Sequence, residues 1–168
     1  MASTITVVDA GEPIAFSLED MMRYHGPGSP GGVAHAFKVM ERAFPRLEPE
    51  GRPERREIMV RTAFGGPGAR DAFELVTRAV TGERYVLDAG LARPERGRTL
   101  ERFVFRLDYR DRSVTLVVRE DCVPDELIDL ARTEPRSPEQ ERRFAAVKRE
   151  VADLVMSRDA ADVYDVVG

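Results

Sequence analysis

The side chains best placed to do chemistry in this sequence stand beside two glycine-rich turns. His25 opens the first turn, residues 25–32 with the sequence HGPGSPGG, and Asp71 follows the second, residues 65–68 with the sequence GGPG. An imidazole before such a turn can act as a general base, a general acid or a metal ligand. Asp71 lies where a carboxylate either stabilises the start of a helix or points into a pocket. We therefore take His25 as the candidate catalytic residue.

Each turn leads into a segment with helical periodicity, and this arrangement favours anion binding. Glycines let backbone N–H groups approach a carboxylate or phosphate, which the positive end of the helix dipole also attracts. We expect the two turns to converge on one pocket for a small anionic molecule; the alternative is that they are only tight turns. The residues predicted to line the pocket are Gly28, Ser29, Gly31, Arg70 and Asp71.

Residues 26–31 also match the dinucleotide-binding pattern GxGxxG, but their context disfavours it. That pattern needs a preceding strand, whereas residues 18–24 have helical periodicity, and the GK[ST] ending of a phosphate-binding P-loop is absent. Ser29 lacks the G-x-S-x-G sequence that exposes a nucleophilic serine. We expect its hydroxyl to cap a helix.

Other reactive side chains have simpler interpretations. His35 shares a helix face with Lys38 and Arg42, opposite an apolar stripe, so we expect it at the surface. Glu74 and Arg78 have the i, i+4 spacing of an ion pair on a solvent-exposed helix face.

Hydrophobic periodicity predicts the elements that position these residues. Residues 100–109 and 113–119 alternate across a short spacer, which predicts an antiparallel hairpin. Ser137 and Gln140 form a capping box at the start of a long helix. Further helices are predicted over residues 18–24, 33–44 (ending near Pro45), 69–80 (with Gly82 at its end) and from Pro124 to Ala131, and further strands over 57–64 and 84–88.

This order of elements predicts an α+β fold. It comprises a helix, a strand, a helix and three strands, with a mainly antiparallel mixed sheet covered by helices, followed by C-terminal helices. We expect a single domain over residues 1–168, with a core at about 18–120 and a helical extension at about 121–168.

Composition excludes several classes of protein. The chain has 168 residues, of which 42% are hydrophobic and 33% charged, as is typical of one soluble globular domain. A net charge of -4 disfavours nucleic acid, and a single cysteine, Cys122, flanked by Asp121, fits neither a disulfide nor an activated thiolate. No apolar run is long enough to span a membrane, and residues 1–8 lack the features of a secretion signal. We expect a cytoplasmic protein without membrane or nucleic-acid partners.

Residues 25–31 resemble the opening motif of the FmdE family, the FmdE component of formylmethanofuran dehydrogenase and its relatives, which reads His-Gly-His-x-Cys-Pro-Gly before a helix. A second motif of that family, an extended segment ending in Thr and then Asp-Ala in a helix with an internal Thr, is similar to Thr62, Asp71-Ala72 and Thr77. The resemblance covers about residues 18–120. It implies the same order of helices and strands, and a homodimer.

This sequence departs from the family motifs at the positions that hold the family's metal ligands. Pro27 stands in place of the second histidine, Ser29 in place of the motif cysteine and Ala79 in place of a helix-borne cysteine. Since zinc prefers three or four ligands, and only His25 and Asp71 match, we expect no metal and no other cofactor.

Three functions remain open at this point. The leading one is a metal-independent small-molecule binding protein or degenerate FmdE-like enzyme. The second is a metal-dependent enzyme with a rebuilt histidine and carboxylate site, because hard ions need mostly oxygen ligands. The third is an interaction partner within a larger redox complex, as the resemblance implies.

Overall fold

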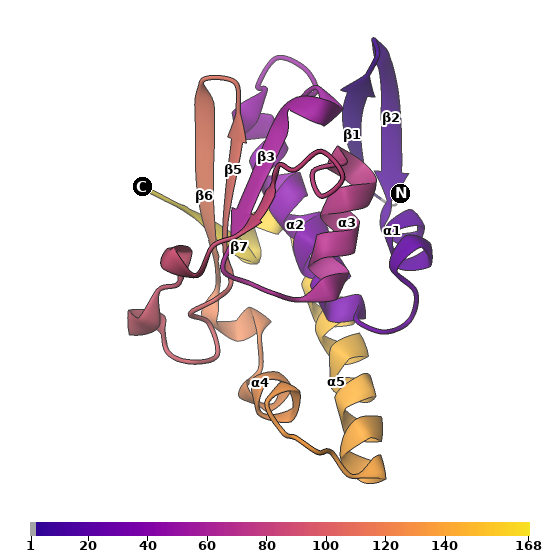
Figure 1. Cartoon of the computed structure of the whole chain (residues 1–168), viewed down its shortest axis with the longest axis vertical. Helices are drawn as coiled ribbons and strands as arrows, with labels where there is room; N and C mark the ends of the chain where they lie inside the picture. The colour runs from indigo at the N-terminus through magenta and orange to yellow at the C-terminus, as the bar shows by residue number, and fades with distance from the viewer. Residues whose placement is uncertain (1–2) are drawn as a thin grey trace.

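The computed structural model, which describes residues 3–168, has an α+β fold, as expected from the sequence (Figure 1). Met1 and Ala2, the first residues of the segment considered above for a secretion signal, lie outside the described residues. The helices are α1 (Leu18–His25), α2 (Pro30–Leu47), α3 (Pro67–Thr77), α4 (Asp125–Ala131) and α5 (Pro138–Met156). The strands are β1 (Thr4–Asp9), β2 (Glu12–Ser17), β3 (Ile58–Thr62), β4 (Tyr85–Leu87), β5 (Val104–Tyr109), β6 (Arg112–Val118) and β7 (Tyr164–Val167).

The main sheet has five strands in the order β4-β3-β5-β6-β7. Only the β3–β4 pair is parallel; the other pairs are antiparallel. The predicted hairpin is confirmed as β5–β6, in which Tyr109 pairs with Arg112 across a two-residue turn. Side chains alternate as expected, so Phe105 and Leu107 are fully buried while Arg106 faces solvent.

Three strands have no counterpart in the sequence analysis. β1 and β2 form a separate two-stranded hairpin, whose turn residues Ala10 and Gly11 have positive φ angles of 51° and 82°. β7 adds a last strand to the main sheet by pairing with β6. The segment after residue 121 is therefore not purely helical.

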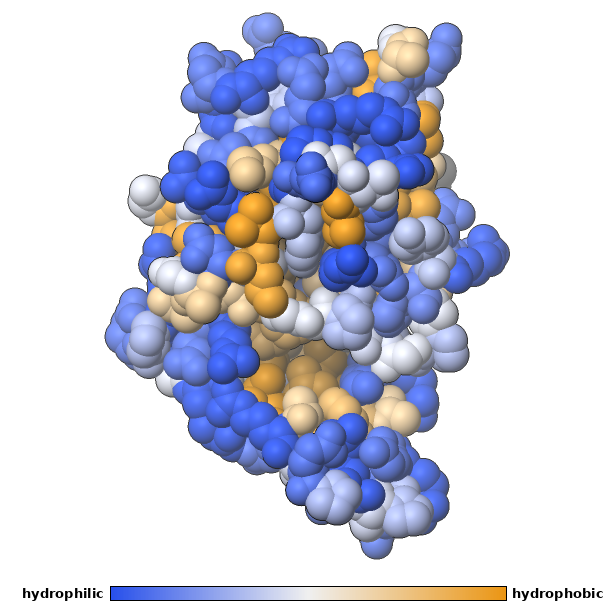
Figure 2. Space-filling model, viewed as in Figure 1, coloured by the Kyte–Doolittle hydropathy of each residue, from blue (hydrophilic) through white to orange (hydrophobic). Residues whose placement is uncertain are grey.

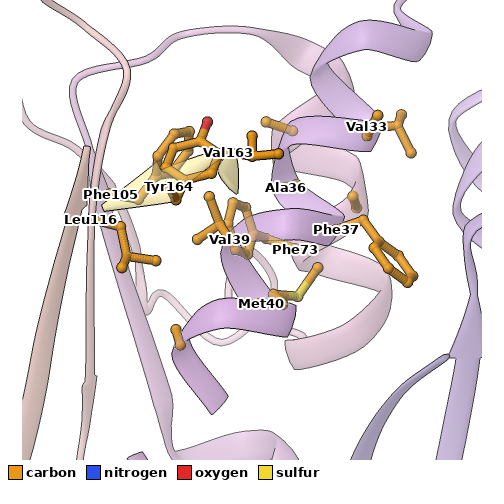
Figure 3. Close-up of a cluster of buried hydrophobic side chains, with 14 of the residues drawn as sticks. Val33, Ala36, Phe37, Val39, Met40, Phe73, Phe105, Leu116, Val163 and Tyr164 are labelled. Carbon is orange, nitrogen blue, oxygen red and sulfur yellow. The ribbon is translucent and has the colours of Figure 1, made fainter. Parts of the chain in front are cut away.

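Helix α2 forms the centre of the molecule. Figure 3 shows Ala36 and Val39 pointing from α2 toward Phe105 and Tyr164 on the sheet, while Phe37 extends from the other side of the helix. Helix α2 also packs against α1, α3 and α5. The helix also continues through Pro45 to Leu47, beyond its predicted end, because Phe44 and Leu47 are buried and hold the last turn in place.

The expectation that His35 is a surface residue is wrong. Its side chain is 1% exposed, and its Nδ1 lies 2.8 Å from the Tyr164 hydroxyl. Lys38 on the same face is also buried, where its Nζ donates to Glu41 at 2.9 Å. The reason is β7, which covers the α2 face that the sequence suggested was open.

The solvent-exposed ion pair expected on α3 is also wrong in part. The Nε of Arg78 does lie 3.6 Å from Oε2 of Glu74. However, Glu74 is buried, and its carboxylate accepts a hydrogen bond from the Thr81 N–H at 3.0 Å. Arg78 itself ends the helix with a φ of 56°, so Gly82 is not the terminating residue. The chain folds back after α3 and brings Thr81 onto the Glu74 carboxylate.

The C-terminal helices are integral to the core. The predicted capping box of α5 is present, with the Ser137 hydroxyl and the Gln140 side chain each accepting from the other residue's N–H. Val147, Val151 and Val155 of α5 are buried, and this helix packs along α2. No helix within residues 3–168 is both long enough and apolar enough to cross a bilayer.

Candidate functional site

The two glycine-rich turns meet, because the first turns of α2 and α3 pack backbone against backbone. A β-carbon on Gly32 would lie 3.1 Å from the Ala69 nitrogen, and one on Gly68 would overlap the Ser29 carbonyl oxygen. Only glycine allows this approach at Gly68. Two segments that are about 40 residues apart along the chain therefore form one junction, with the positive ends of two helix dipoles side by side.

On one side of this junction, His25 and Asp71 form a hydrogen-bonded pair. His25 is the last residue of α1, and its Nδ1 lies 2.8 Å from Oδ2 of Asp71 in α3. Because a carboxylate only accepts hydrogen bonds, Nδ1 is the donor in this contact, and in the neutral imidazole the lone pair is then on Nε2. The His25 side chain is only 8% exposed, and its Nε2 is buried without a hydrogen-bond partner in the described chain. A free, oriented imidazole nitrogen is the chemistry of a general base.

On the other side lies an apolar cavity of about 320 Å³. Figure 2 shows it as a hollow with hydrophobic walls. Helices α4 and α5, together with the two turns, enclose it. The lining residues are Ser29, Gly31, Gly32, Phe64, Gly66, Pro67, Gly68, Phe103, Leu127, Ile128, Ala131, Phe144 and Lys148.

The walls of the cavity are apolar, but the end formed by the first turns of α2 and α3 and by Lys148 carries positive charge. Neither α2 nor α3 has a side-chain cap or an acidic residue in its first turn, so nothing on the helices themselves offsets their dipoles there. Lys148 adds a full charge: its Nζ donates to the Gly28 carbonyl at 3.0 Å and lies 3.9 Å from the centre of the Phe144 ring. Burial lowers the pKa of this amine. An anionic group would be attracted to this end of the cavity.

The predicted site residues are brought together, but not into one pocket. Ser29 and Gly31 line the apolar cavity. Gly28 lies beside His25, since a β-carbon on it would be 3.9 Å from Nε2. Arg70 is half-exposed and faces a different cavity. The Ser29 hydroxyl makes no capping hydrogen bond, contrary to expectation, although the residue does stand at the N-cap position of α2.

Several lining residues were missed from the sequence. Phe144 and Lys148 come from α5, more than a hundred residues after the first turn, and reach the cavity only through tertiary packing. One signal was present: Lys148 is one of only two lysines in an arginine-rich chain. Cys122 is buried, where desolvation and the neighbouring Asp121 raise the pKa of its thiol, so its environment does not favour the thiolate.

The fold and the site thus define an α+β protein with a small, ligand-sized apolar cavity beside a histidine–carboxylate pair. Among residues 3–168, no three His, Cys, Asp or Glu side chains are grouped closely enough to hold a metal ion. Comparison with models of known protein families and with curated protein sequences finds no match to this chain.

Proposed function

We propose that this protein is a metal-independent binding protein, or a degenerate enzyme, of the FmdE-like type, which holds a small carboxylate-type molecule. The observation that carries this proposal is the cavity between the two glycine-rich turns and α5. Its walls suit an apolar body, while Lys148 and the two uncapped helix starts suit a carboxylate. We also propose a homodimer, on the resemblance, and a cytoplasmic location, on the composition.

The size of the cavity limits the ligand. At about 320 Å³, it lies at the lower end of the range of small-molecule sites. Aromatic and aliphatic side chains from four segments surround it, and these favour a compact hydrocarbon body over a sugar or nucleotide. Short aliphatic carboxylates, such as hexanoate, are therefore the first probes.

We expect hexanoate to stabilise the protein and its neutral analogue hexanamide to do so much less. A ligand at a hundred times its Kd adds about 2.7 kcal/mol to the free energy of unfolding. Replacing Lys148 by Met removes the charge and should weaken hexanoate binding by about tenfold, since one charge-assisted hydrogen bond contributes about 1.5 kcal/mol or more. Calorimetric titration gives both affinities directly.

A substitution that blocks the cavity can be compared with matched controls on the exposed surface of α5. Ala131 is exposed and lines the cavity, so Ala131→Trp should block it, whereas Ala145→Trp on the exposed surface of α5 should not. Arg149→Met, also on α5, controls for the loss of one positive charge. Equal affinities for hexanoate and hexanamide, or equal effects of the two Trp substitutions, would contradict the proposal.

A second candidate function, proton-transfer catalysis, is favoured by the His25–Asp71 pair alone. A positioned general base contributes about 10²- to 10⁴-fold to a reaction rate. We expect His25→Ala to lower the hydrolysis of an activated ester, such as p-nitrophenyl acetate, by about a hundredfold. Asp71→Asn should lower it less, because the imidazole remains but loses its orientation. Tyr24→Phe, at an exposed neighbour, is the control, and a wild-type rate no faster than that of His25→Ala would rule this function out.

A further inference from the structure

A second cavity, of about 280 Å³, lies between the start of α3 and strand β4. It is lined by Phe64, Gly65, Gly66, Arg70, Val80, Tyr85 and Leu87. It shares only Phe64 and Gly66 with the first cavity. The Phe64 ring lies against Gly66, where a β-carbon would overlap it, and stacks on Phe103 with ring centres 4.4 Å apart. Phe64 and Gly66 therefore border both cavities.

Tyr85 lines this second cavity, and its hydroxyl is an unusual group. Its oxygen is buried and has no hydrogen-bond partner within the described residues. A buried hydroxyl left without a partner is unfavourable, and a hydrogen-bond acceptor on a ligand would relieve this cost. Burial raises the pKa of Tyr85 to about 12, so the hydroxyl keeps its proton and remains a donor at neutral pH.

Arg70 supplies a charge to the same cavity. Arg70 and Tyr85 line the cavity together, and the charge of the guanidinium opposes the rise in the pKa of Tyr85. Its contact with a carboxylate is a distant one, 3.8 Å to Asp71, and the other oxygen of Asp71 is bonded to His25. Most of the five guanidinium donors therefore remain free to bind a planar carboxylate.

The remaining walls are apolar, and one of them is open to water. Leu87 is 62% exposed at the edge strand β4, and Val80 and Phe64 complete the surface. An inorganic anion would leave this surface uncovered, whereas an organic acid would bury it. We infer that this cavity is a second ligand site, for a small aromatic carboxylate whose carboxyl group is bound by the Arg70 guanidinium and the Tyr85 hydroxyl.

Nuclear magnetic resonance with labelled tyrosine rings tests this site on the whole protein. The chain has four tyrosines, so each ring signal can be followed, and Tyr85→Phe assigns the signal of interest. Millimolar benzoate should shift the Tyr85 signal, and benzamide should bind at least about tenfold more weakly, because it lacks the charge that Arg70 recognises. Arg70→Gln should weaken benzoate binding by about tenfold or more.

Controls separate this site from the proposed function. Arg23→Gln, on the exposed surface of α1, and Tyr24→Phe, also exposed, should leave benzoate binding unchanged. Lys148→Met should leave the benzoate-induced shift of Tyr85 intact while it weakens hexanoate binding. A Tyr85 signal that does not move with benzoate, or moves equally with benzamide or in Arg70→Gln, would overturn the inference.

Discussion

Replacing Gly68 by Ala is expected to lower the free energy of unfolding by about 3 kcal/mol or more. The added methyl group would overlap the carbonyl oxygen of Ser29 and approach the Val33 nitrogen to 3.1 Å. Both obstacles are backbone atoms within the first turn of α2 or beside it, so neither can move aside by changing a rotamer. Helices α2 and α3 must separate, and the resulting shift of α3 should also disturb the hydrogen bond from Asp71 in α3 to His25 at the end of α1.

Urea unfolding of Gly68→Ala and of a nearby control measures this effect. Gly65 belongs to the same turn, but a β-carbon there would meet only the end of the Leu87 side chain at 3.9 Å. Gly65→Ala should therefore change stability by no more than about 0.5 kcal/mol. If the two variants unfold at the same urea concentration, the close contact between α2 and α3 is not what the structure indicates.

Acidification from pH 6.5 to pH 4 should cost the protein about 3 kcal/mol through His35 alone. Burial lowers the pKa of His35 to about 4 in the folded protein, from 6.5 in the unfolded chain. Between these values the unfolded state binds more protons, so stability is complete above pH 6.5 and falls by about 1.4 kcal/mol per pH unit as the pH decreases. Below pH 4 both states are protonated and this contribution becomes constant.

Carboxylates also titrate on the acid side, so a variant isolates the contribution of His35. His35→Gln retains a polar side chain opposite the Tyr164 hydroxyl but cannot titrate. Burial raises the pKa values of Tyr164 and Cys122, so neither group contributes in this range. The difference in unfolding free energy between wild type and His35→Gln should change by about 3 kcal/mol from pH 6.5 to pH 4. Parallel pH curves would show that His35 is not buried in its neutral form.

Local sequence patterns were sufficient for elements whose stabilising contacts are close in the chain. The β5–β6 hairpin needs only alternation and a short turn, and the capping box at Ser137 needs only four residues. β7 has no such local signal, because its four residues pair with a strand about 50 residues earlier in the chain. Missing β7 led directly to the wrong placement of His35. In a helix that is buried on opposite sides, such as α2, one apolar stripe does not show which of the remaining residues are exposed.

In the candidate site, too, features encoded locally could be predicted, whereas those that depend on contacts between distant segments could not. The sequence indicated that each glycine-rich turn begins a helix, and that the two turns converge was an assumption; the structure brings these turns together. The cavity wall from α4 and α5 could not be foreseen, since a helix sequence shows that one face is buried but not which partner it covers. Phe144 therefore could not be told apart from other members of an amphipathic helix, and Lys148 stood out only as a rare lysine. The separate environment of Arg70 and Tyr85 was missed for the same reason as Phe144.

The hydrogen bond between His35 and Tyr164 joins residues that are 129 positions apart. On the ribosome, His35 is made long before the strand that shelters it. At roughly 5–20 residues per second, the interval is on the order of 10 s. Throughout that time the sheet-facing surface of α2 lacks its last covering strand, and an imidazole destined for the interior remains in water. This core therefore cannot be completed until Tyr164 has been made, and until then the nascent chain exposes the apolar surface that β7 covers in the folded protein.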